Sequence, residues 1–538
     1  MDLYTPTGDN DPLAGTAIAQ FTVNADCDGK TLNAAIRSDG LQHEVSYTEA
    51  DGTTQTAQAV ALDGHEAVDE DGDVCLAAGT YYVGTDIAYA NRIWPAGDVT
   101  LILVDGKTMT LASNKKGIYG GYNLTIYGQS LDADDAGTLR YDGTSDGITA
   151  DNYVQHSGNV SITTTGSSVF GIDAKVTLRG GTLTITANGD DALAIFGYTH
   201  SILGGQLTAT GSNATGIRAS DDAGTVLTLG WTRPADFITV SSIRTDDDGG
   251  TVAVKDGQAL CYADGDNKVV LSGTLTSEQI TALAGKTLQP CLALADAADN
   301  TAAIDDHAGQ TLAVALSGRT LYKDGSWNTL CLPFDISTAS GPLSGNNVQA
   351  MTLNTSSSSL ADGTLTLNFD DAKGETIPAG TPFIIKWDNT GVNITNPVFM
   401  GVTVSNATND ATVKDVLTFT GTYAPVTIPA TGDNTKLYLG AANKLYYPSK
   451  TMTIGTHRAY FQLADGITAG EPASLVRAFA LNFGDDESTG ITEAEANSSL
   501  FTLHSSLQDW YTLDGRRLDG QPTAKGLYIH GGKKVIVK

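Results

Sequence analysis

The chain has 538 residues, of which 31 are Lys or Arg and 61 are Asp or Glu, giving a formal net charge of -30. This length exceeds one ordinary core and predicts roughly three or four domains of about 100 to 200 residues each. A chain this acidic is repelled by phosphate backbones and anionic lipid headgroups, which argues against a nucleic-acid partner. With no apolar run of about 18 residues, the sequence also predicts no transmembrane segment.

The composition predicts an all-β fold. Sixty glycines, abundant Thr and Val, and acidic residues that are mostly Asp are typical of short strands joined by turns. No Glu occurs between Glu70 and Glu278, where long helices would have recruited it. We expect a right-handed parallel β-helix, followed by a β-sandwich and a short C-terminal β-hairpin unit that acts in sorting.

Residues 1–94 hold alternating stretches such as "FTVNA" and "LAAGTYYVG", which predict a small β module or a cap over the solenoid. The first residues, "MDLYTPTGDNDP", contain no basic or apolar region and therefore no signal peptide. The expectation is either a cytoplasmic protein or one whose removed leader has been replaced by Met1.

The stretch "DEDGDV" places Asp69, Asp71 and Asp73 at alternate positions, as calcium ligands are placed in an EF-type loop. Val74 stands where such a loop has its Gly, and Thr80 where it has its bidentate Glu. A solvated acidic turn is favoured over calcium at this position.

An internal repeat predicts the solenoid, which we place at residues 95–245. Three segments stack by eye: "VSITTTGSSVFGIDA", "LTITANGDDALAIFG" and "LTATGSNATGIRAS". Three apolar or Gly series recur every 22 to 24 residues: Ile162, Ile185 and Leu207; Gly166, Gly189 and Gly211; and Ile148, Ile172, Ile195 and Ile217. A period of this length with Gly turns is typical of one supersecondary unit repeated, with coils about 4.8 Å apart.

Stacked turns would bring carboxylates from successive coils to one side, within reach of a cation such as calcium. The candidate metal ligands here are Asp173, Asp190 and Asp191, and the candidate ligand-binding residues are Asp190, Asp191, Phe196, Tyr198, Arg218, Asp221 and Asp222. Aromatic rings would supply platforms for sugars, and the available ones are Trp94, Tyr119, Tyr122, Tyr127, Phe196 and Tyr198. Core packing explains each ring at least as well.

The repeat and its acidity resemble those of β-helical carbohydrate-binding proteins, in which calcium bridges acidic sugars or cellulose lies on the solenoid face. That resemblance implies a glycan ligand and calcium as the only expected cofactor. Polysaccharide lyases share the scaffold and use a basic residue beside Asp-bound calcium; Arg218 and Arg179 are the nearby candidates. Neither lies in a recognisable lyase motif.

Residues 246–310 predict a mixed connector with one good helix in "TSEQITALAG", where Thr276 is the N-cap and Gln279 completes a capping box. Residues 311–482 alternate as a β-sandwich does, and residues 483–510 are polar, as a linker would be. Within the sandwich, "WNTLCLPFD", "IPAGTPFIIKW", "LYLGAANKLYYP" and "HRAYFQL" resemble a module of surface-associated proteins from gut and oral Bacteroidota.

Residues 511–538 form a basic tail, "YTLDGRRLDGQPTAKGLYIHGGKKVIVK", on an acidic chain. It resembles the C-terminal sorting domain of type IX secretion cargo, and the residues that carry the likeness are Asp514, Gly515, Arg516, Gly526, Tyr528 and the run from Lys533 to Lys538. The resemblance implies recognition by the secretion apparatus and a secreted or outer-cell-surface location.

The sequence thus favours a non-enzymatic, adhesin-like surface protein that binds a glycan or another surface ligand through its solenoid. Two alternatives stay open: a lyase or hydrolase that acts on acidic polysaccharide, and a structural spacer. The five cysteines, Cys27, Cys75, Cys261, Cys291 and Cys331, lie far apart in sequence. They allow one or two disulfides with an odd thiol, or five buried apolar side chains.

Overall fold

A computed structural model describes residues 42–484 except 113, 132–133, 212–214, 221–223, 246–249, 266, 346, 389–390, 430–433, 441–442, 449 and 471–474, together with residues 2–4, 17–20, 488–493, 495–497, 510–511, 517–518, 522, 525–530 and 533–537. The chain divides into two compact units, unit 1 (Met1–Leu292) and unit 2 (Ala293–Lys538). Strands account for 51% of the residues and helices for 3%, which confirms the all-β prediction.

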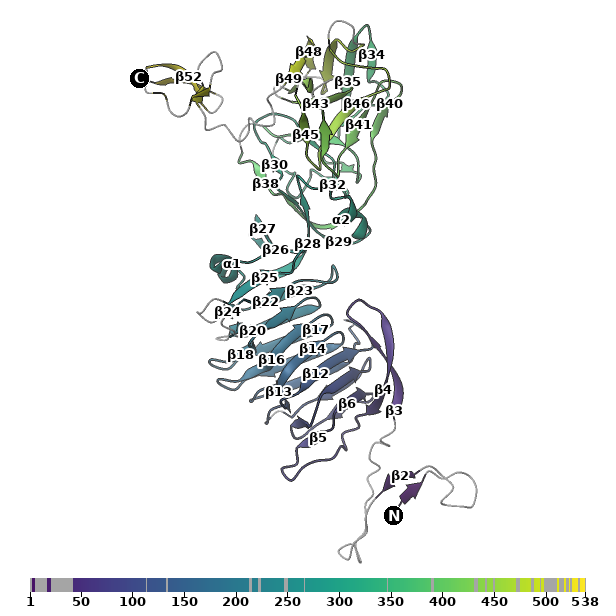
Figure 1. The fold of residues 1–538 in the computed structure, drawn as a ribbon, viewed down its shortest axis with the longest axis vertical. Coiled ribbons are helices and arrows are strands. Elements are labelled where there is room, and N and C mark those ends of the chain that lie inside the picture. The colour runs from purple at the N-terminus through teal and green to yellow at the C-terminus, as the bar shows by residue number, and fades with distance from the viewer. Residues whose placement is uncertain are drawn as a thin grey trace, which may run out of the picture. The chain divides into compact units, whose positions relative to one another are not determined.

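Unit 1 contains a parallel β-solenoid of about 10 turns, whose strands stack into three faces (Figure 1). The face that we call the ladder face comprises β5 (Val74–Leu76), β8 (Ile93–Pro95), β11 (Ile118–Tyr119), the first halves of β14 (Ile148–Gln155) and β16 (Phe170–Leu178), β18 (Leu193–Gly197), β21 (Thr215–Ala219) and β24 (Ile243–Thr245). The hydroxyl face comprises β7 (Ile87–Ala88), β10 (Thr108–Thr110), β13 (Thr138–Gly143), β15 (Asn159–Thr164), β17 (Thr182–Ala187), β20 (Gln206–Gly211) and β23 (Phe237–Val240).

The third face carries a hairpin at its N-terminal end. Its strands are β6 (Gly79–Val83), β9 (Val99–Leu103), β12 (Asn123–Gly128), the second halves of β14 and β16, β19 (His200–Ile202), β22 (Thr225–Leu229) and β25 (Thr251–Val254). The hairpin of β3 (Gln42–Thr48) and β4 (Thr54–Ala61) joins this sheet through β6 and packs Val45 and Ala59 against Ile102. Parallel stacking therefore begins before residue 95, and the predicted N-terminal module already contains solenoid strands.

The repeat predicts the register of the ladder face correctly. Ile148, Ile172, Ile195 and Ile217 stand opposite one another in successive strands, and each is fully buried. On the hydroxyl face Ile162 pairs with Ile185, but Ile185 then pairs with Ala209, while Leu207 pairs with Leu183. The predicted match of Leu207 is wrong by two residues, because a shift of two keeps the same side chains inside and apolar alternation does not detect it.

Glycines let the coils stack closely at one corner. Gly158, Gly181 and Gly205 all have φ between 73° and 79°, a conformation that L side chains rarely adopt. A Cβ on Gly181 or Gly205 would also lie closer than 3.0 Å to the backbone of the preceding coil. Gly181 and Gly205 therefore mark turns where neither the backbone conformation nor the space admits a side chain.

Strands β26 (Ala259–Asp264), β27 (Asn267–Leu271) and β28 (Thr287–Ala295) close the C-terminal end of the solenoid, and β28 pairs antiparallel with β23. Helix α1 (Ser277–Ala282) lies between β27 and β28 and has the predicted capping box of Thr276 and Gln279. A second helix, α2 (Thr301–Asp306), follows in unit 2. The sequence predicts only the first, since α2 has no side-chain cap at its N-terminus.

Unit 2 contains a β-sandwich. One sheet comprises β31 (Asn328–Leu330), β33 (Gln349–Leu353), β34 (Ser359–Ala361), β35 (Thr364–Asp371), β37 (Phe383–Lys386), β47 (Ala478–Asn482) and β48 (Ser488–Glu493). The other comprises β40 (Ala411–Val413), β41 (Leu417–Gly421), β43 (Lys436–Leu439), β44 (Leu445–Pro448), β46 (Ala459–Leu463) and β49 (Glu495–Asn497). Leu367 and Ile384 of the first sheet share one core with Phe419 and Phe461 of the second.

Shorter pairs complete the unit: β29 (Thr311–Ser317) with β39 (Val398–Thr403), β30 (Thr320–Leu321) with β38 (Ile394–Thr395), β32 (Ile336–Ser337) with β36 (Thr376–Ile377), and β42 (Val426–Ile428) with β45 (Met452–Ile454). Strands β48 and β49 lie within residues 483–510, the predicted linker, where β48 pairs with β47 of the first sheet and β49 with β44 of the second.

Short strands are described near both ends of the chain. Strands β1 (Asp2–Tyr4) and β2 (Ala17–Gln20) pair near the N-terminus. In the tail, β50 (Trp510–Tyr511), β51 (Arg517–Leu518), β52 (Gly526–His530) and β53 (Lys533–Val537) form a small antiparallel sheet in the order β51-β50-β52-β53. Gly526 and Tyr528 lie in β52, whereas Asp514, Gly515, Arg516 and Lys538 lie outside the described residues.

Candidate functional site

One column of side chains runs along the outside of the ladder face. Each coil places one residue in it because residues in register on stacked parallel strands point to the same side of the sheet. Between the buried positions, this outward column contains Cys75, Trp94, Tyr119, Thr149, Asp173, Phe196, Arg218 and Arg244. The column thus has aromatic rings toward each end, polar groups between them and two arginines at its C-terminal end.

The N-terminal end of the column is a cluster of rings and cations. The rings of Trp94 and Tyr119 meet edge to face at 5.4 Å between centroids. The Arg92 guanidinium carbon lies 4.9 Å from the Trp94 ring, and the Lys116 ammonium lies 4.2 Å from the Tyr119 ring. Trp94 is 38% exposed, which is unusual for so large an apolar side chain.

Two buried aspartates hold these cations in place. Asp73 is 1% exposed and pairs with Arg92 at 2.6 Å and Lys115 at 3.4 Å. Asp146 is 8% exposed; it pairs with Lys116 at 2.9 Å and accepts a hydrogen bond from the Phe170 backbone N–H. Buried charges without such partners would cost several kcal/mol, so both aspartates fix the positions of the cations against the rings.

The middle and the far end of the column combine a carboxyl group with a second aromatic pair. Burial, together with the nearby Asp146 carboxylate, raises the pKa of Asp173, and Lys116 opposes that shift. One coil further, Phe196 stacks on Phe170 at 4.9 Å between centroids. The guanidinium carbon of Arg218 lies 5.7 Å from the Phe196 ring, so this end repeats the pairing of ring and cation.

A shallow polar groove lies on the hydroxyl face of the same coils. It encloses about 590 Å³ and is lined by Tyr89, Ala90, Thr108, Thr110, Leu111, Ala112, Asn114, Arg140 and Asp142. A smaller hollow of about 380 Å³ shares Asn114 and Asp142 with it. Arg140 donates to Asp142 through two nitrogens, at 3.2 and 2.5 Å, and both side chains stay about half exposed. The same turn carries Asn114, which lines this groove, and Lys116, which contacts the Tyr119 ring of the column.

The structure brings together some of the predicted binding residues. Asp173, Phe196 and Arg218 occupy three successive positions of the column. Asp190 and Asp191 lie in the exposed turn before β18, and Tyr198, 73% exposed, follows that strand. Asp221 and Asp222 lie outside the described residues.

The aromatic residues named from the sequence fall into three groups. Trp94, Tyr119 and Phe196 stand in the column, Tyr122 and Tyr198 are exposed beside it, and Tyr127 packs against the β3–β4 hairpin. Sequence reasoning missed Arg92, Lys116 and Asp146. The alternation "RIWP" and the pair "KK" before "GIY" were visible signals, but only the register shows that they meet.

The predicted calcium ligands do not converge. Asp69 accepts hydrogen bonds from the backbone N–H groups of Asp71 and Asp73, both at 2.9 Å, as in an acidic turn. The Asp73 carboxylate faces Arg92 and Lys115 instead. In the part of the chain that the structure describes, no three His, Cys, Asp or Glu side chains are grouped to hold a metal ion. Calcium binding stays a prediction.

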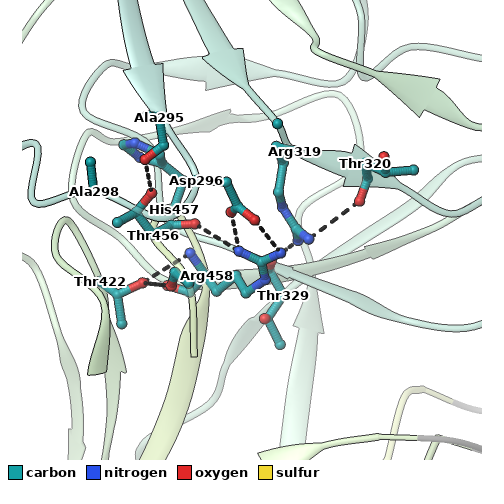
Figure 2. Close-up of polar contacts among 12 residues, drawn as sticks. Ala295, Asp296, Ala298, Arg319, Thr320, Thr329, Thr422, Thr456, His457 and Arg458 are labelled. Carbon is teal, nitrogen blue, oxygen red and sulfur yellow. Dashed lines mark hydrogen bonds and ion pairs between the residues drawn. The ribbon is translucent and has the colours of Figure 1, made fainter. Parts of the chain in front are cut away.

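Unit 2 holds a separate charged cluster, which Figure 2 shows. Arg458 makes two hydrogen bonds to the Asp296 carboxylate, one of them between Nη2 and Oδ2 at 2.9 Å. Arg319, 6% exposed, donates to the carbonyl oxygens of Thr320 and Thr329 at 3.3 and 3.1 Å. Burial and the nearby Arg458 lower the pKa of the Arg319 guanidinium to about 9, so this group stays charged at neutral pH.

The cluster ties three segments together. Thr456 donates from its backbone N–H to the Asp296 carbonyl at 2.9 Å and from its hydroxyl to the Ala295 carbonyl at 3.0 Å. The next residue, His457, donates its backbone N–H to the Thr422 carbonyl at 2.7 Å and is fully buried. These contacts join segments of one unit, so the cluster stabilises the fold.

The fold and the column together define a β-solenoid protein with a built surface of rings and cations. Comparisons of the chain with protein-family models, curated proteins and solved structures give no match. Among the described residues, no helix has the length and apolar character needed to cross a membrane. A proposal for the function of this protein therefore rests mainly on the residues of the outward column.

Proposed function

We propose that this protein is a secreted or cell-surface, non-enzymatic binding protein that holds a glycan chain along the outward column. The observation that carries the proposal is the alignment of Trp94, Tyr119 and Phe196 with the Asp173 carboxyl group between them. Aromatic ring faces pack against the apolar C–H faces of sugar rings, while hydroxyl and carboxyl groups bond the sugar hydroxyls.

The spacing of the column suits an extended chain. From Tyr119 to Phe196 there are three coil steps, or roughly 14 Å at the usual strand spacing. A short run of sugar units would rest on a ring at each end and meet the Asp173 carboxyl group between them. Because rigid strands carry all of these side chains, little ordering would accompany binding.

The charge of the column favours an acidic glycan. The column, the cations that contact its rings and the ion pairs that these cations form supply five positive groups, Arg92, Lys115, Lys116, Arg218 and Arg244, against the carboxylates of Asp73, Asp146 and Asp173. This excess of two positive charges stands on a chain whose net charge is -30. Uronate-rich polysaccharides would be attracted to it at short range, and added salt would weaken the attraction.

Binding to polygalacturonate and to a neutral β-glucan tests the proposal. Replacing both Trp94 and Tyr119 with alanine should raise the dissociation constant for the bound glycan about 30-fold, which corresponds to about 2 kcal/mol for the loss of a central aromatic anchor. Isothermal titration calorimetry measures the effect, and a parallel titration in EDTA tests whether calcium bridges the ligand.

Tyr122→Ala is the matched control, since Tyr122 is 42% exposed on the same coil but outside the column. Its affinity should equal that of the wild type. If the double variant binds as well as the wild type, or if Tyr122→Ala loses as much affinity, the column is not the site. If the wild type binds neither glycan, the spacer alternative is favoured.

One observation favours the enzymatic alternative. Asp173 stands in the column and has a raised pKa, to which the nearby buried Asp146 carboxylate contributes, as suits an acid catalyst of a hydrolase. New reducing ends after incubation with polygalacturonate, abolished by Asp173→Asn, would indicate a hydrolase. Absorbance from unsaturated uronates would indicate a lyase, for which Arg218 stands in the column and Arg179 lies outside it.

We expect export of the protein to depend on its C-terminal tail, residues 511–538. In a host with type IX secretion, the chain lacking residues 511–538 should stay inside the cell while the full chain reaches the surface or the medium. Immunoblots of cell fractions measure this difference. The tail strands pair with one another in a sheet of their own, so the truncated chain should melt at the same temperature as the full chain. Equal export of both chains would refute a sorting role.

A further inference from the structure

Two cysteines meet in the strands that close the solenoid. In the antiparallel pair of β26 and β28, Ala259 stands opposite Cys291 and Cys261 opposite Gln289. Cys261 and Cys291 are therefore diagonal neighbours on one face of this sheet, 0% and 1% exposed. Their thiols are joined by a hydrogen bond.

The other described cysteines lack such an arrangement. Cys75 is exposed at the N-terminal end of the outward column, next to Trp94. Cys331 lies in unit 2, where burial raises the pKa of its thiol to about 12 and keeps it protonated. Cys27 lies outside the described residues.

We propose that Cys261 and Cys291 form a disulfide bond when the chain folds in an oxidising compartment. A disulfide of a thiol oxidase or of oxidised glutathione is the oxidant. The Cys261 thiolate attacks that disulfide, forming a mixed disulfide and releasing one thiol. The Cys291 thiolate then attacks the Cys261 sulfur and displaces the second thiol. In total, two protons leave the cysteines, and two electrons reduce the oxidant to its dithiol form.

Local chemistry supports the order of these steps. In the folded chain the hydrogen bond with Cys291 lowers the pKa of Cys261, and Lys268 acts in the same direction. Lys268 lies on the neighbouring strand β27 and still acts while β28 is open, which favours Cys261 as the first nucleophile. Both sulfurs are buried in the folded chain, so the bond forms while β28 is still open. Diagonal neighbours in an antiparallel sheet lie slightly farther apart than bonded cysteines, and closing the bond draws β26 and β28 together locally.

The bond would secure the end of the solenoid. Strand β28 also pairs with β23, the last strand of the hydroxyl face, and the Trp231 indole N–H donates to the Ala259 carbonyl at 3.0 Å. A disulfide here would link the closing strands around the segment that contains α1. Closing a loop of about 30 residues should raise the melting temperature of unit 1 by roughly 5 °C. This inference is independent of glycan binding.

Peptide mapping and melting curves test the proposal on the full chain. The chain is refolded with reduced and oxidised glutathione, alkylated under denaturing conditions without reductant, and digested. The expected product is one linked pair of peptides containing Cys261 and Cys291, lighter by two hydrogens than the sum of the free peptides. A reductant should lower the melting temperature of the wild type and of Cys75→Ser, but not that of the variant with both Cys261→Ala and Cys291→Ala.

Three results would overturn the proposal. Complete alkylation of Cys261 and Cys291 after oxidative refolding would show that no bond forms. A link from either residue to Cys27, Cys75 or Cys331 would assign a different pairing. An equal response to reductant in the wild type and in the double variant would place the stabilising bond elsewhere. The peptide map decides even if the double variant folds poorly.

Discussion

Replacing Asp296 with alanine should lower the free energy of unfolding of unit 2 by about 3 kcal/mol, because it removes the carboxylate of a largely buried ion pair and leaves the positive charges around it uncompensated. The effect is large here since the same carboxylate faces Arg458 directly and is the acidic group that favours the charged form of buried Arg319. Buried Arg319 would then lose the carboxylate that favours its charged form.

Hydrogen exchange read by mass spectrometry measures this loss within unit 2. Peptides that contain Thr456 and Arg458 should exchange on the order of 100-fold faster in the variant, as 3 kcal/mol implies. Glu375→Ala removes an exposed acidic side chain from the same unit and should leave exchange unchanged. If Asp296→Ala exchanges like Glu375→Ala, the cluster does not stabilise the unit.

Acid should destabilise unit 2 through His457. Burial, reinforced by Arg319, lowers the pKa of this imidazole to about 3, whereas an unfolded histidine titrates near 6.5. Between these values the unfolded chain binds a proton that the folded chain does not, so stability falls as pH falls from about 6.5 toward 3. The slope is about 1.4 kcal/mol per pH unit, or about 3 kcal/mol between pH 6.5 and pH 4.

His457→Asn isolates this contribution. Asparagine tolerates the φ of 54° at this position and carries no titrating group. The variant should lose stability at pH 7, but its deficit relative to the wild type should shrink by about 3 kcal/mol at pH 4. Urea unfolding with hydrogen exchange measures both curves. In unit 1, buried His200, whose pKa burial lowers to about 4, should give the same acid sensitivity in both proteins. Parallel pH curves for unit 2 would refute the role of His457.

The strand register of the middle coils of the solenoid could be predicted from the sequence because these coils have nearly equal lengths. From Ile148 to Ile172, Ile195 and Ile217, the steps are 24, 23 and 22 residues. Asp173, Phe196 and Arg218 each follow one of these isoleucines, so their places in the column could be predicted. Period-2 alternation then separates the buried positions from the outward ones.

The N-terminal end of the column could not be predicted in the same way. From Val74 to Ile93, Ile118 and Ile148 the steps are 19, 25 and 30 residues, because the turns between faces differ in length. No fixed period connects Trp94 with Tyr119. The unit 2 cluster is hidden for another reason: "HRAYFQL" contains both His457 and Arg458, but Asp296 lies 162 residues from Arg458.

Because the turns differ in length while the strands still stack, each coil can vary its turn and its outward side chain independently of the other coils. Each coil adds one outward side chain, and a turn can lengthen at a corner without disturbing the strands that stack above and beneath it. Duplicating or deleting a whole coil would lengthen or shorten the surface by about 4.8 Å and leave every other side chain in place. The ligand specificity of such a protein could therefore change during evolution by the substitution, gain or loss of single coils, while the fold stays the same.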